Sequence, residues 1–323
     1  MHRKLLNEAR LSLSLTVQGP LLVKSGTENW DPSIPDMQFI RTLRGDGRET
    51  VFIPGSSLKG TLRSYTEKIA RTLNVSCCDP FEERGRDQSC GKKLDAAAKQ
   101  SDSFAIYRGS CVACRIYGST TLAGRAQFAD SYPTADLSPN LTRRTAVAID
   151  RILGSVSAGP FEFEALMAGT FRTEIRLTNF ELWQIGLIGF AIRDLCLGRI
   201  KIGYGKSRGL GDVNATLDAL ELRSITSDGI QQANGKLSIK GIGALLNEKE
   251  RESYGIAASE IPPATIDSPI APKPELIGSS IEFRRAAEGE DWAAREAALL
   301  FNACIDKSWT SYRDANQVGA PPR

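Results

Sequence analysis

The sequence predicts an α+β fold in which two helices alternate with the strands of a ferredoxin-like sheet. Residues 11–17 and 213–222 alternate apolar with polar side chains, which is the two-residue period of a half-buried strand. Residues 58–73 and 180–197 carry apolar side chains at helical spacing. Further strands lie between the two helices, so the predicted order is strand, helix, strands, helix, strand.

The segment after the first strand is predicted to be irregular. Residues 24–50 are polar and contain several Gly and Pro residues, which indicates a long loop, and residues 51–53 form a short apolar strand. Ser56 or Ser57 can then cap the first helix, which runs to about Leu73.

Two alternating stretches, 161–167 and 171–177, flank an Ala-Gly-Thr turn and are predicted to pair as a hairpin. The second helix follows at once, with Asn179 or Thr178 as its cap and a glycine at its end. The complete element order also fits an RNA-recognition-motif sheet that carries long insertions.

The C-terminal third differs in composition. Residues 225–280 are rich in Gly, Ser and Pro, which predicts a linker or a loosely attached arm. Residues 281–323 regain helical character, and one face of a helix there can bury Trp292, Leu299, Ala303 and Cys304. We expect this helix to pack on its own chain; docking to a partner is the alternative.

Composition excludes several kinds of chemistry. The chain of 323 residues contains one histidine, His2, so catalysis that needs a positioned imidazole is excluded. No apolar run is long enough for a membrane span, and the N-terminus does not resemble a secretory signal, so we expect a cytoplasmic protein. Residues 1–213 hold 29 basic and 22 acidic residues, which favours a polyanion partner, whereas residues 214–323 hold 12 and 16.

The cysteines predict a structural zinc site. Five of the seven lie between Cys77 and Cys114, and Cys111 and Cys114 form a CxxC pair. Cys90 and Cys78 complete four thiolates, with Cys77 as the alternative to Cys78. Four thiolates fill the tetrahedral shell of Zn²⁺ and leave no position for a reacting water, so the role is structural. The alternative is a set of free thiols in a loop.

The start of the first helix is a candidate anion site. The first turn of a helix has free backbone N–H groups, and Ser56 and Ser57 add hydroxyl donors. Lys59 and Arg63 are four residues apart and share one helix face. The alternative is an ordinary capped helix with solvated basic residues.

A glycine-rich segment at 203–211 can approach a phosphate chain closely, with Lys206, Ser207 and Arg208 as contacts. Its glycine spacing matches neither the Walker A motif nor the dinucleotide fingerprint, and a strand follows it where those motifs open a helix. A flexible turn is the alternative.

Residues 142–172 look like a long hairpin with a basic base and a Gly/Ser-rich tip. The basic residues are Arg143, Arg144 and Arg151. Such a projection can wedge between nucleotides, or it can be an ordinary edge hairpin.

Together these segments resemble the RAMP superfamily of CRISPR proteins, and in particular the repeating backbone subunit of type III effector complexes. The resemblance covers most of residues 11–222. The motifs that carry it, in the family's order, are IPGSSLKGTLRS at 53–64, CxxCxIYGS at 111–119, TAVAIDRILGSVSAG…FEFEAL at 145–166 and GYGKSRGLGDV at 203–213.

This resemblance implies a modified RNA-recognition-motif palm within residues 1–224, with a zinc-binding insertion at about 75–118 and a thumb hairpin at about 142–169. Subunits of the family stack along the CRISPR guide RNA, and each thumb kinks the duplex of guide and target RNA. The guide grip then uses Ser56, Ser57, Lys59, Arg63 and the loop at 203–209. The partners implied are guide RNA, target RNA and other effector subunits, with no membrane.

In members that cleave target RNA, an acidic loop residue lies at the kinked phosphate. The family pattern Asp-x-x-x-Ile-Arg matches Asp36 to Arg41, so Asp36 is the catalytic candidate, with Asp31 as the competitor. Attack by the neighbouring 2′-hydroxyl is then aided by Mg²⁺ or Mn²⁺.

The alternatives to a cleaving subunit are a purely structural subunit of the same complex, a stand-alone endoribonuclease that processes CRISPR repeats, and a zinc-stabilised protein-interaction module.

Overall fold

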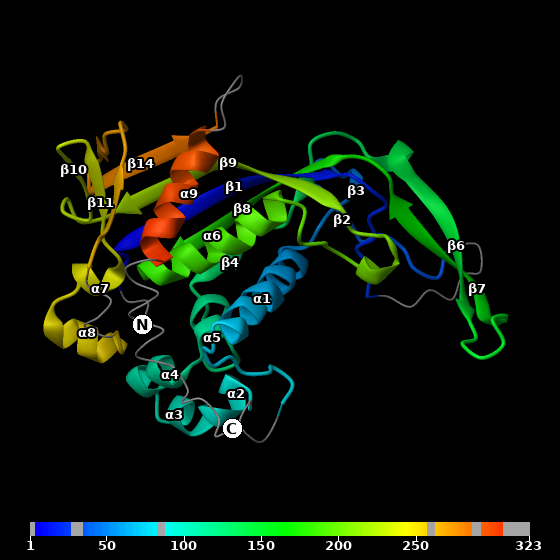
Figure 1. Cartoon of the computed structure of the whole chain (residues 1–323), viewed down its shortest axis with the longest axis horizontal. Coiled ribbons are helices and arrows are strands. Elements are labelled where there is room, and N and C mark those ends of the chain that lie inside the picture. The colour runs from blue at the N-terminus through cyan, green and yellow to red at the C-terminus, as the bar shows by residue number, and fades with distance from the viewer. Residues whose placement is uncertain (1–3, 27–34, 83–87, 257–261, 286–291, 306–323) are drawn as a thin grey trace.

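The computed structural model describes residues 4–26, 35–82, 88–256, 262–285 and 292–305. A twisted sheet forms the body, helices cover one of its sides, and a long hairpin projects beyond it (Figure 1). The predicted α+β class is confirmed. Among the described residues, no helix combines the length and the hydropathy that a membrane-spanning segment requires.

The central sheet is antiparallel and follows the order β13-β14-β9-β1-β8-β4, with the short β5 also paired to β8. Its strands are β1 (Asn7–Val17), β4 (Ala126–Phe128), β5 (Tyr132–Pro133), β8 (Thr170–Thr178), β9 (Val213–Ser224), β13 (Lys273–Pro274) and β14 (Ser279–Arg284). Every second residue of β1 is buried, as the alternation predicts, because side chains point to opposite faces along a strand.

Helices α1 (Gly55–Thr72) and α6 (Leu182–Cys196) pack against each other and against the buried side of this sheet. The serine cap predicted for α1 is wrong: its N-cap is Pro54, and the backbone N–H of Gly55 donates instead to Asp130 Oδ1 at 2.8 Å. A distant loop therefore caps this helix.

The cap predicted for α6 is also wrong. Glu181 is the N-cap and forms a capping box with Gln184. Asn179 has a left-handed backbone, with φ of 54°, and its side chain joins Leu6 N–H to the Lys4 carbonyl. Asn179 thus holds the start of β1 and is not free to cap the helix.

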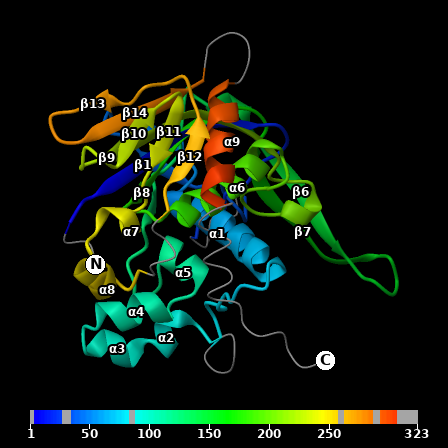
Figure 2. The same cartoon turned by 60° about the vertical axis from the view of Figure 1, so that its left-hand side comes forward.

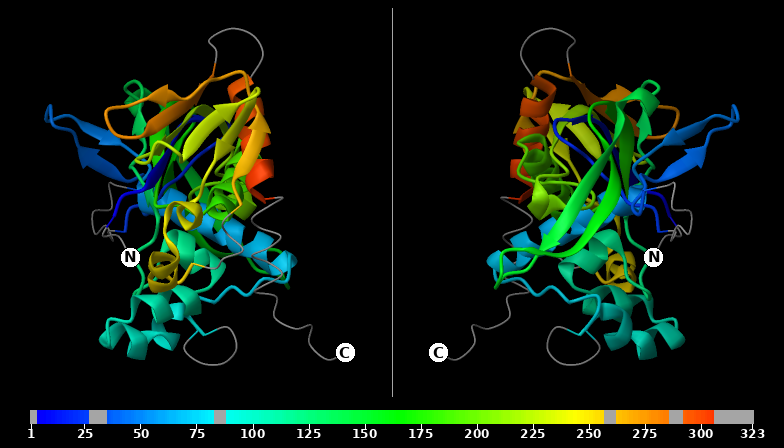
Figure 3. Two further views of the ribbon diagram at one scale, coloured as in Figure 1. Left: turned by 90° about the vertical axis from the view of Figure 1, so that its left-hand side faces the viewer. Right: turned by 90° about the vertical axis from the view of Figure 1, so that its right-hand side faces the viewer.

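The predicted hairpin of 161–167 with 171–177 does not form. The turn between the two strands is present, but β7 (Val156–Leu166) pairs with β6 (Leu141–Ile149), whereas β8 pairs with β1. β6 and β7 form a projecting two-stranded ribbon, which we call the β6–β7 hairpin. After β7 the chain passes from this hairpin into the central sheet at β8 (Figure 3). The loop predicted at 24–50 likewise contains a small ribbon of β2 (Arg41–Leu43) and β3 (Glu49–Val51).

A cluster of short helices lies between α1 and β4 in the sequence and below the sheet in the structure (Figure 2). These helices are α2 (Cys90–Lys93), α3 (Asp95–Lys99), α4 (Ser103–Gly109) and α5 (Val112–Tyr117). The guanidinium groups of Arg115 and Arg125 lie 4.9 and 4.8 Å from the ring centroid of Tyr107. This stack fastens the helical cluster to the body of the protein.

Residues 225–280 differ from the linker that their composition indicates. They contain β10 (Ile230–Ala233), β11 (Lys236–Ile239), α7 (Ile242–Leu245), α8 (Glu248–Tyr254) and β12 (Ala264–Asp267), followed by β13 and the first two residues of β14. Strands β10, β11 and β12 form a sheet whose buried residues, such as Leu237 and Ile266, join the main core. Residues 225–280 are polar on average, but their few apolar residues lie where they can be buried. The burial of these residues outweighs the polar composition of the segment, so the segment folds.

Helix α9 (Trp292–Cys304) packs on α6, on its own chain as expected. Its buried face is Ala297, Leu300, Phe301 and Cys304, whereas Leu299, expected to be buried, is 44% exposed. Ala303 is half-buried, and the side chain of Trp292 lies outside the described residues.

The contact between α9 and α6 depends on glycine. A Cβ atom added to Gly189 of α6 would lie 2.2 Å from Cγ of Phe301, and one added to Gly186 would lie 2.6 Å from Ile305 Cγ1. These two glycines let the helices approach closely, which the apolar pattern of α9 alone does not reveal.

Candidate nucleic-acid interface and metal site

The root of the β6–β7 hairpin is bound to two segments from earlier in the chain. Leu21 and Leu166 exchange both backbone hydrogen bonds, at 2.9 and 2.8 Å. The N–H of Met37 donates to the Glu162 carbonyl at 3.2 Å, and the N–H of Glu164 donates to the Met37 carbonyl at 2.9 Å. The loop that carries Asp36 is therefore fixed along β7.

Asp36 lies at this root with an exposed side chain. Its Oδ2 atom accepts a hydrogen bond from the backbone N–H of Glu162 at 2.9 Å. The other carboxylate oxygen has no side-chain partner within the described part of the chain, so it is available to solvent or to a ligand. The competing candidate, Asp31, lies outside the described residues.

Arg41, the second residue of the Ile-Arg pair, has a structural role. Its two terminal nitrogens each bind one carboxylate oxygen of Glu164 at 2.9 Å, and Glu164 Oε2 also accepts the N–H of Phe39 at 3.0 Å. Bidentate pairs of this kind are strong and directional. We name this contact the Arg41–Glu164 clamp. Sequence reasoning missed Glu164, because the alternating pattern of β7 shows a strand but not its partner.

The glycine-rich segment faces the same root. Lys206, Ser207 and Arg208 form an exposed 3-10 turn between Gly205 and Gly209, both left-handed with φ of 69° and 81°. Lys206 Nζ lies 3.4 Å from Thr61 Oγ1 of α1, which places this loop beside the helix.

A pocket of about 240 Å³ opens where the hairpin and the glycine-rich loop meet. Arg144 lines it from β6 and Arg208 from the loop, and Met37 contributes from the position next to Asp36. The structure thus brings together three sequence-predicted segments that lie far apart in the chain, around Met37, Arg144 and Arg208. We call this place the junction pocket.

The other two hairpin arginines lie elsewhere. Arg143 neighbours Arg144 on β6, so its side chain points to the opposite face of the ribbon. Arg151 is exposed in the turn at the tip, among the exposed apolar residues Ile149, Ile152 and Leu153.

Lys59 of α1 and Lys206 of the glycine-rich loop both lie in surroundings that disfavour their positive charge. Lys59 is half-buried, and burial together with the nearby charge of Arg63 lowers its pKa. Although Lys206 lies on an exposed turn, partial desolvation of its ammonium group and the charge of Lys68 likewise lower its pKa. Cations that crowd one another in this way are more stable once an anion joins them. Ser56 is exposed and Ser57 is half-buried at the same end of α1.

Arg63 points inward to the cysteine-rich segment. It donates to Glu67 Oε1 and to the Gly118 carbonyl, each at 2.8 Å, and lies 3.4 Å from Cys114 Sγ. Burial opposes its charge, but the ion pair with Glu67 prevails and raises the pKa of Arg63. Within the described structure its partners are therefore protein groups, in contrast to the phosphate contact predicted from its spacing with Lys59.

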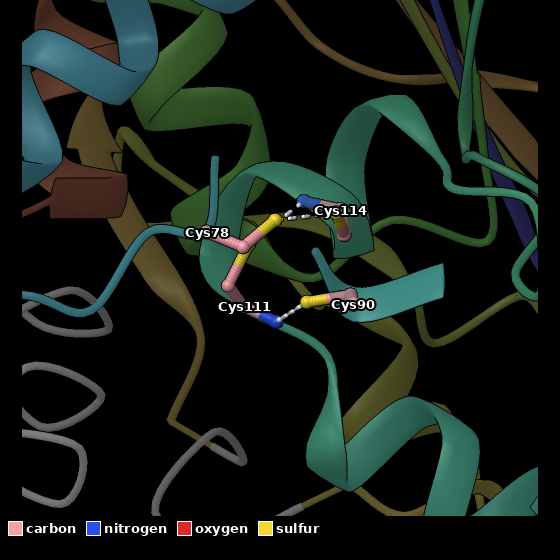
Figure 4. Close-up of side chains that lie close together, drawn as sticks. All are labelled: Cys78, Cys90, Cys111 and Cys114. Atoms are coloured by element: carbon pink, nitrogen blue, oxygen red, sulfur yellow. Dashed lines mark hydrogen bonds between the residues drawn. The ribbon is translucent and has the colours of Figure 1, made fainter. Parts of the chain in front are cut away.

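Four cysteines come together near Arg63. The Sγ atoms of Cys78, Cys90, Cys111 and Cys114 all lie within 4.8 Å of one another (Figure 4). Cys78 Sγ is 3.6 Å from both Cys111 Sγ and Cys114 Sγ. A tetrahedron of sulfurs around a zinc ion has edges of about 3.8 Å, from a Zn–S bond of about 2.3 Å. The quartet fits a metal ion of this type.

Backbone groups support this cluster. The N–H of Cys111 donates to Cys90 Sγ at 3.2 Å, and the N–H of Cys114 donates to Cys111 Sγ at 3.5 Å. Hydrogen bonds between the thiols, and then burial, raise the pKa of Cys114, whereas the hydrogen bonds of Cys111 with the neighbouring thiols, Cys114 first, lower the pKa of Cys111. Cys77, left open as an alternative, is buried in the main core and is not part of the quartet.

The open face of the central sheet carries charged side chains from β1 and β8. Some of them pair with one another: Glu8 contacts Arg10 at 2.7 Å and Arg176 at 3.8 Å. The outward-facing residues of β1, β8 and β9 include no aromatic side chain on which a base can stack. On the same face, β5 places the partly exposed ring of Tyr132 opposite Arg172, and the guanidinium carbon of Arg44 lies 5.4 Å from the centroid of that ring.

Comparison with known families agrees with the motifs. A family model described as the RAMP superfamily matches residues 14–214. This match runs from the last part of β1 to the start of β9 and includes the cysteine quartet, the β6–β7 hairpin and the glycine-rich loop. No curated protein matches the chain.

Proposed function

The chain belongs to the RAMP superfamily of CRISPR-associated proteins, and we propose that it is the repeating backbone subunit of a type III effector complex. Its partners are then CRISPR guide RNA, target RNA and the neighbouring effector subunits. The order β9-β1-β8-β4, with α1 between β1 and β4 and α6 between β8 and β9, supports a ferredoxin-like palm for this role.

The observation that carries the proposal is the junction pocket. Arg144 and Arg208 supply guanidinium groups from two elements, and Lys206 and Lys59 add positive charge towards α1. Arg144 has no carboxylate partner among the residues that the structure describes. Cations that converge without a protein anion are what a sugar–phosphate chain requires. We infer that guide RNA lies along this surface.

The β6–β7 hairpin has the form of a wedge. Ile152 and Leu153 at its tip are 92% and 80% exposed, and Val156 is 60% exposed. Apolar side chains that are not covered by their own protein can insert between base steps and unstack them. In the proposed assembly this tip separates nucleotides of the guide–target duplex and kinks the target strand.

Asp36 is then the candidate for cleavage at a kinked phosphate. Its free oxygen can accept the proton of the neighbouring 2′-hydroxyl, whose oxygen attacks phosphorus while the bond to the 5′-oxygen breaks. The departing 5′-oxygen takes a proton from water, so the products are a 2′,3′-cyclic phosphate and a 5′-hydroxyl. A single carboxylate can also supply one ligand to Mg²⁺ or Mn²⁺, with RNA oxygens and water as the others; such an ion neutralises phosphate charge.

The test of cleavage is Asp36→Asn in the assembled complex, with Asp46→Asn on the β2–β3 turn as the matched control. A residue acting in proton transfer contributes about 10²- to 10⁴-fold. We expect Asp36→Asn to lose target cutting by that factor while guide binding is kept, and Asp46→Asn to cut normally. Normal cutting by Asp36→Asn would leave a structural subunit that binds RNA without cleaving it.

We also propose that the cysteine quartet holds one structural Zn²⁺ ion. The spacing of the four sulfurs and the two N–H···S hydrogen bonds support this assignment. Cys78, Cys90, Cys111 and Cys114 fill all four positions, so the ion stabilises the segment from α2 to α5 and takes no part in cleavage. Elemental analysis of the purified chain should give about one zinc per protein.

A further inference from the structure

The junction pocket contains more than cations. Met37, Phe163 and Leu210 give it an apolar lining, and Tyr204 contributes an aromatic ring. A bare phosphate would use the arginines and leave this apolar surface in contact with water. The composition of the lining therefore indicates a ligand that has both a charged group and a flat apolar part.

Tyr204 and Arg208 form a stacked pair. The guanidinium carbon of Arg208 lies 5.0 Å from the centroid of the Tyr204 ring. The tyrosine side chain nevertheless remains 40% exposed, so part of the ring is available to a ligand. Aromatic rings and arginine planes are the groups on which proteins stack unpaired bases.

The backbone holds Tyr204 firmly in place. Gly203 and Gly205 on either side are both left-handed, with φ of 77° and 69°. The N–H of Tyr204 donates to the Leu22 carbonyl at 2.7 Å, and a Cβ atom on Gly203 would lie 2.3 Å from that same carbonyl oxygen. The chain can come this close to Leu22 only because residue 203 is glycine, and the result is an exposed ring on a rigid turn.

The volume limits what can enter. At about 240 Å³ the pocket is smaller than the roughly 300–1,000 Å³ of sites for drug-sized ligands. One ring system fits this space, whereas a stack of paired bases does not.

We propose that the junction pocket receives one unstacked nucleobase of the bound RNA, with Tyr204 and Arg208 as the stacking pair and Arg144 on the adjacent phosphate. This assignment rests on the proposed RNA-binding function and adds a base contact to it. The apolar lining and the aromatic ring carry it, since backbone binding needs neither.

The test compares two RNAs with the same number of phosphates, a single-stranded oligoadenosine and its fully abasic counterpart. Each is titrated against the full chain, the Tyr204→Leu variant and the Tyr204→Phe variant. Stacking of one base on one ring corresponds to about a 5- to 150-fold change in affinity. We expect Tyr204→Leu to weaken oligoadenosine binding by such a factor, to leave abasic RNA binding unchanged, and Tyr204→Phe to behave as wild type.

The outcomes separate the two proposals. Equal affinity of Tyr204→Leu and wild type for oligoadenosine, or equal weakening on both RNAs, would overturn the base pocket while RNA binding stands. Failure of the wild-type chain to bind either RNA would instead count against the proposed function. In the assembled complex, a single abasic position is placed either in the guide RNA or in the target RNA. The strand that supplies the base is the one in which the abasic position removes the difference in affinity between Tyr204→Leu and wild type.

Discussion

The Arg41–Glu164 clamp should determine how firmly the Asp36 loop is held. Glu164 accepts three hydrogen bonds, two from Arg41 at 2.9 Å and one from the N–H of Phe39 at 3.0 Å. Only 25% of the Arg41 side chain and 15% of the Glu164 side chain are exposed, so water cannot easily replace these bonds. Glu164→Gln keeps the shape, removes the charge and turns one acceptor into a donor that faces a guanidinium N–H.

The loss of stability expected for Glu164→Gln follows from these contacts. A hydrogen bond to a charged group contributes about 1.5–3 kcal/mol, and breaking a fully buried ion pair costs about 3–5 kcal/mol. Glu49 lies 3.9 Å from Arg41 and partly replaces the lost partner. We therefore expect Glu164→Gln to destabilise the closed loop by about 2–3 kcal/mol.

Hydrogen exchange measures this directly. A loss of about 2–3 kcal/mol speeds exchange of the Met37 and Phe39 amides by about 30- to 150-fold, since about 1.4 kcal/mol corresponds to a factor of ten. The control is Asp46→Asn, which removes an exposed ion pair with Arg48 and should leave those amides unchanged. Exchange at the wild-type rate in Glu164→Gln would show that the clamp does not hold the loop.

Three further predictions concern the metal, the core and pH. Cys111→Ser should lower the zinc content well below one per chain, and a full complement of zinc in that variant would refute the four-thiolate site. Gly189→Ala should lower the free energy of unfolding in urea by about 1–3 kcal/mol, because the new methyl group overpacks the contact with α9. The control Gly60→Ala has nothing within 4 Å of the new methyl group and should raise the free energy of unfolding by about 0.5–1 kcal/mol. Equal effects of the two substitutions would contradict the packing of α9 on α6. The lowered pKa values of Lys59 and Lys206 mean that their charge is lost at lower pH than in ordinary lysines, whose pKa is 10.5. RNA affinity measured by fluorescence anisotropy should therefore fall as the pH approaches 10.5, and a flat profile through that pH would argue against their phosphate contacts.

Periodicity predicted the type of an element more reliably than its partner. The alternation in β1 correctly gave its buried face, and the alternation in β7 and β8 correctly gave two strands. The pairing failed because two adjacent strands with a short turn normally form a hairpin, whereas here the long β6 competes for β7 and the sheet edge at β1 takes β8.

Local capping rules failed where tertiary contacts supplied the same hydrogen bonds. Asp130 replaces a serine cap at α1, and Asn179 is committed to the start of β1. Arg63 failed for a similar reason: its spacing from Lys59 describes one helix face, but only the position of the cysteine-rich segment decides that this side chain is covered.

The basic residues of the candidate site could be predicted from the sequence. The other residues that shape the site could not. Arg144 and Arg208 stand out in the sequence as cations beside glycines and strands. Glu164 and Tyr204 carry no such signal, since one reads as a polar strand position and the other as part of a turn. Their roles arise from Arg41 and Leu22, which lie more than a hundred residues earlier in the chain.

Photo-crosslinking tests the central claim most directly. Guide RNA that carries 4-thiouridine is bound by the full chain in its complex, irradiated, and the attached peptides are identified by mass spectrometry. RNA in the junction pocket and along the adjoining loop predicts crosslinks to peptides from 142–146 and 203–209. Crosslinks confined to the open face of β1 and β8, with those two peptides unmodified, would contradict the account.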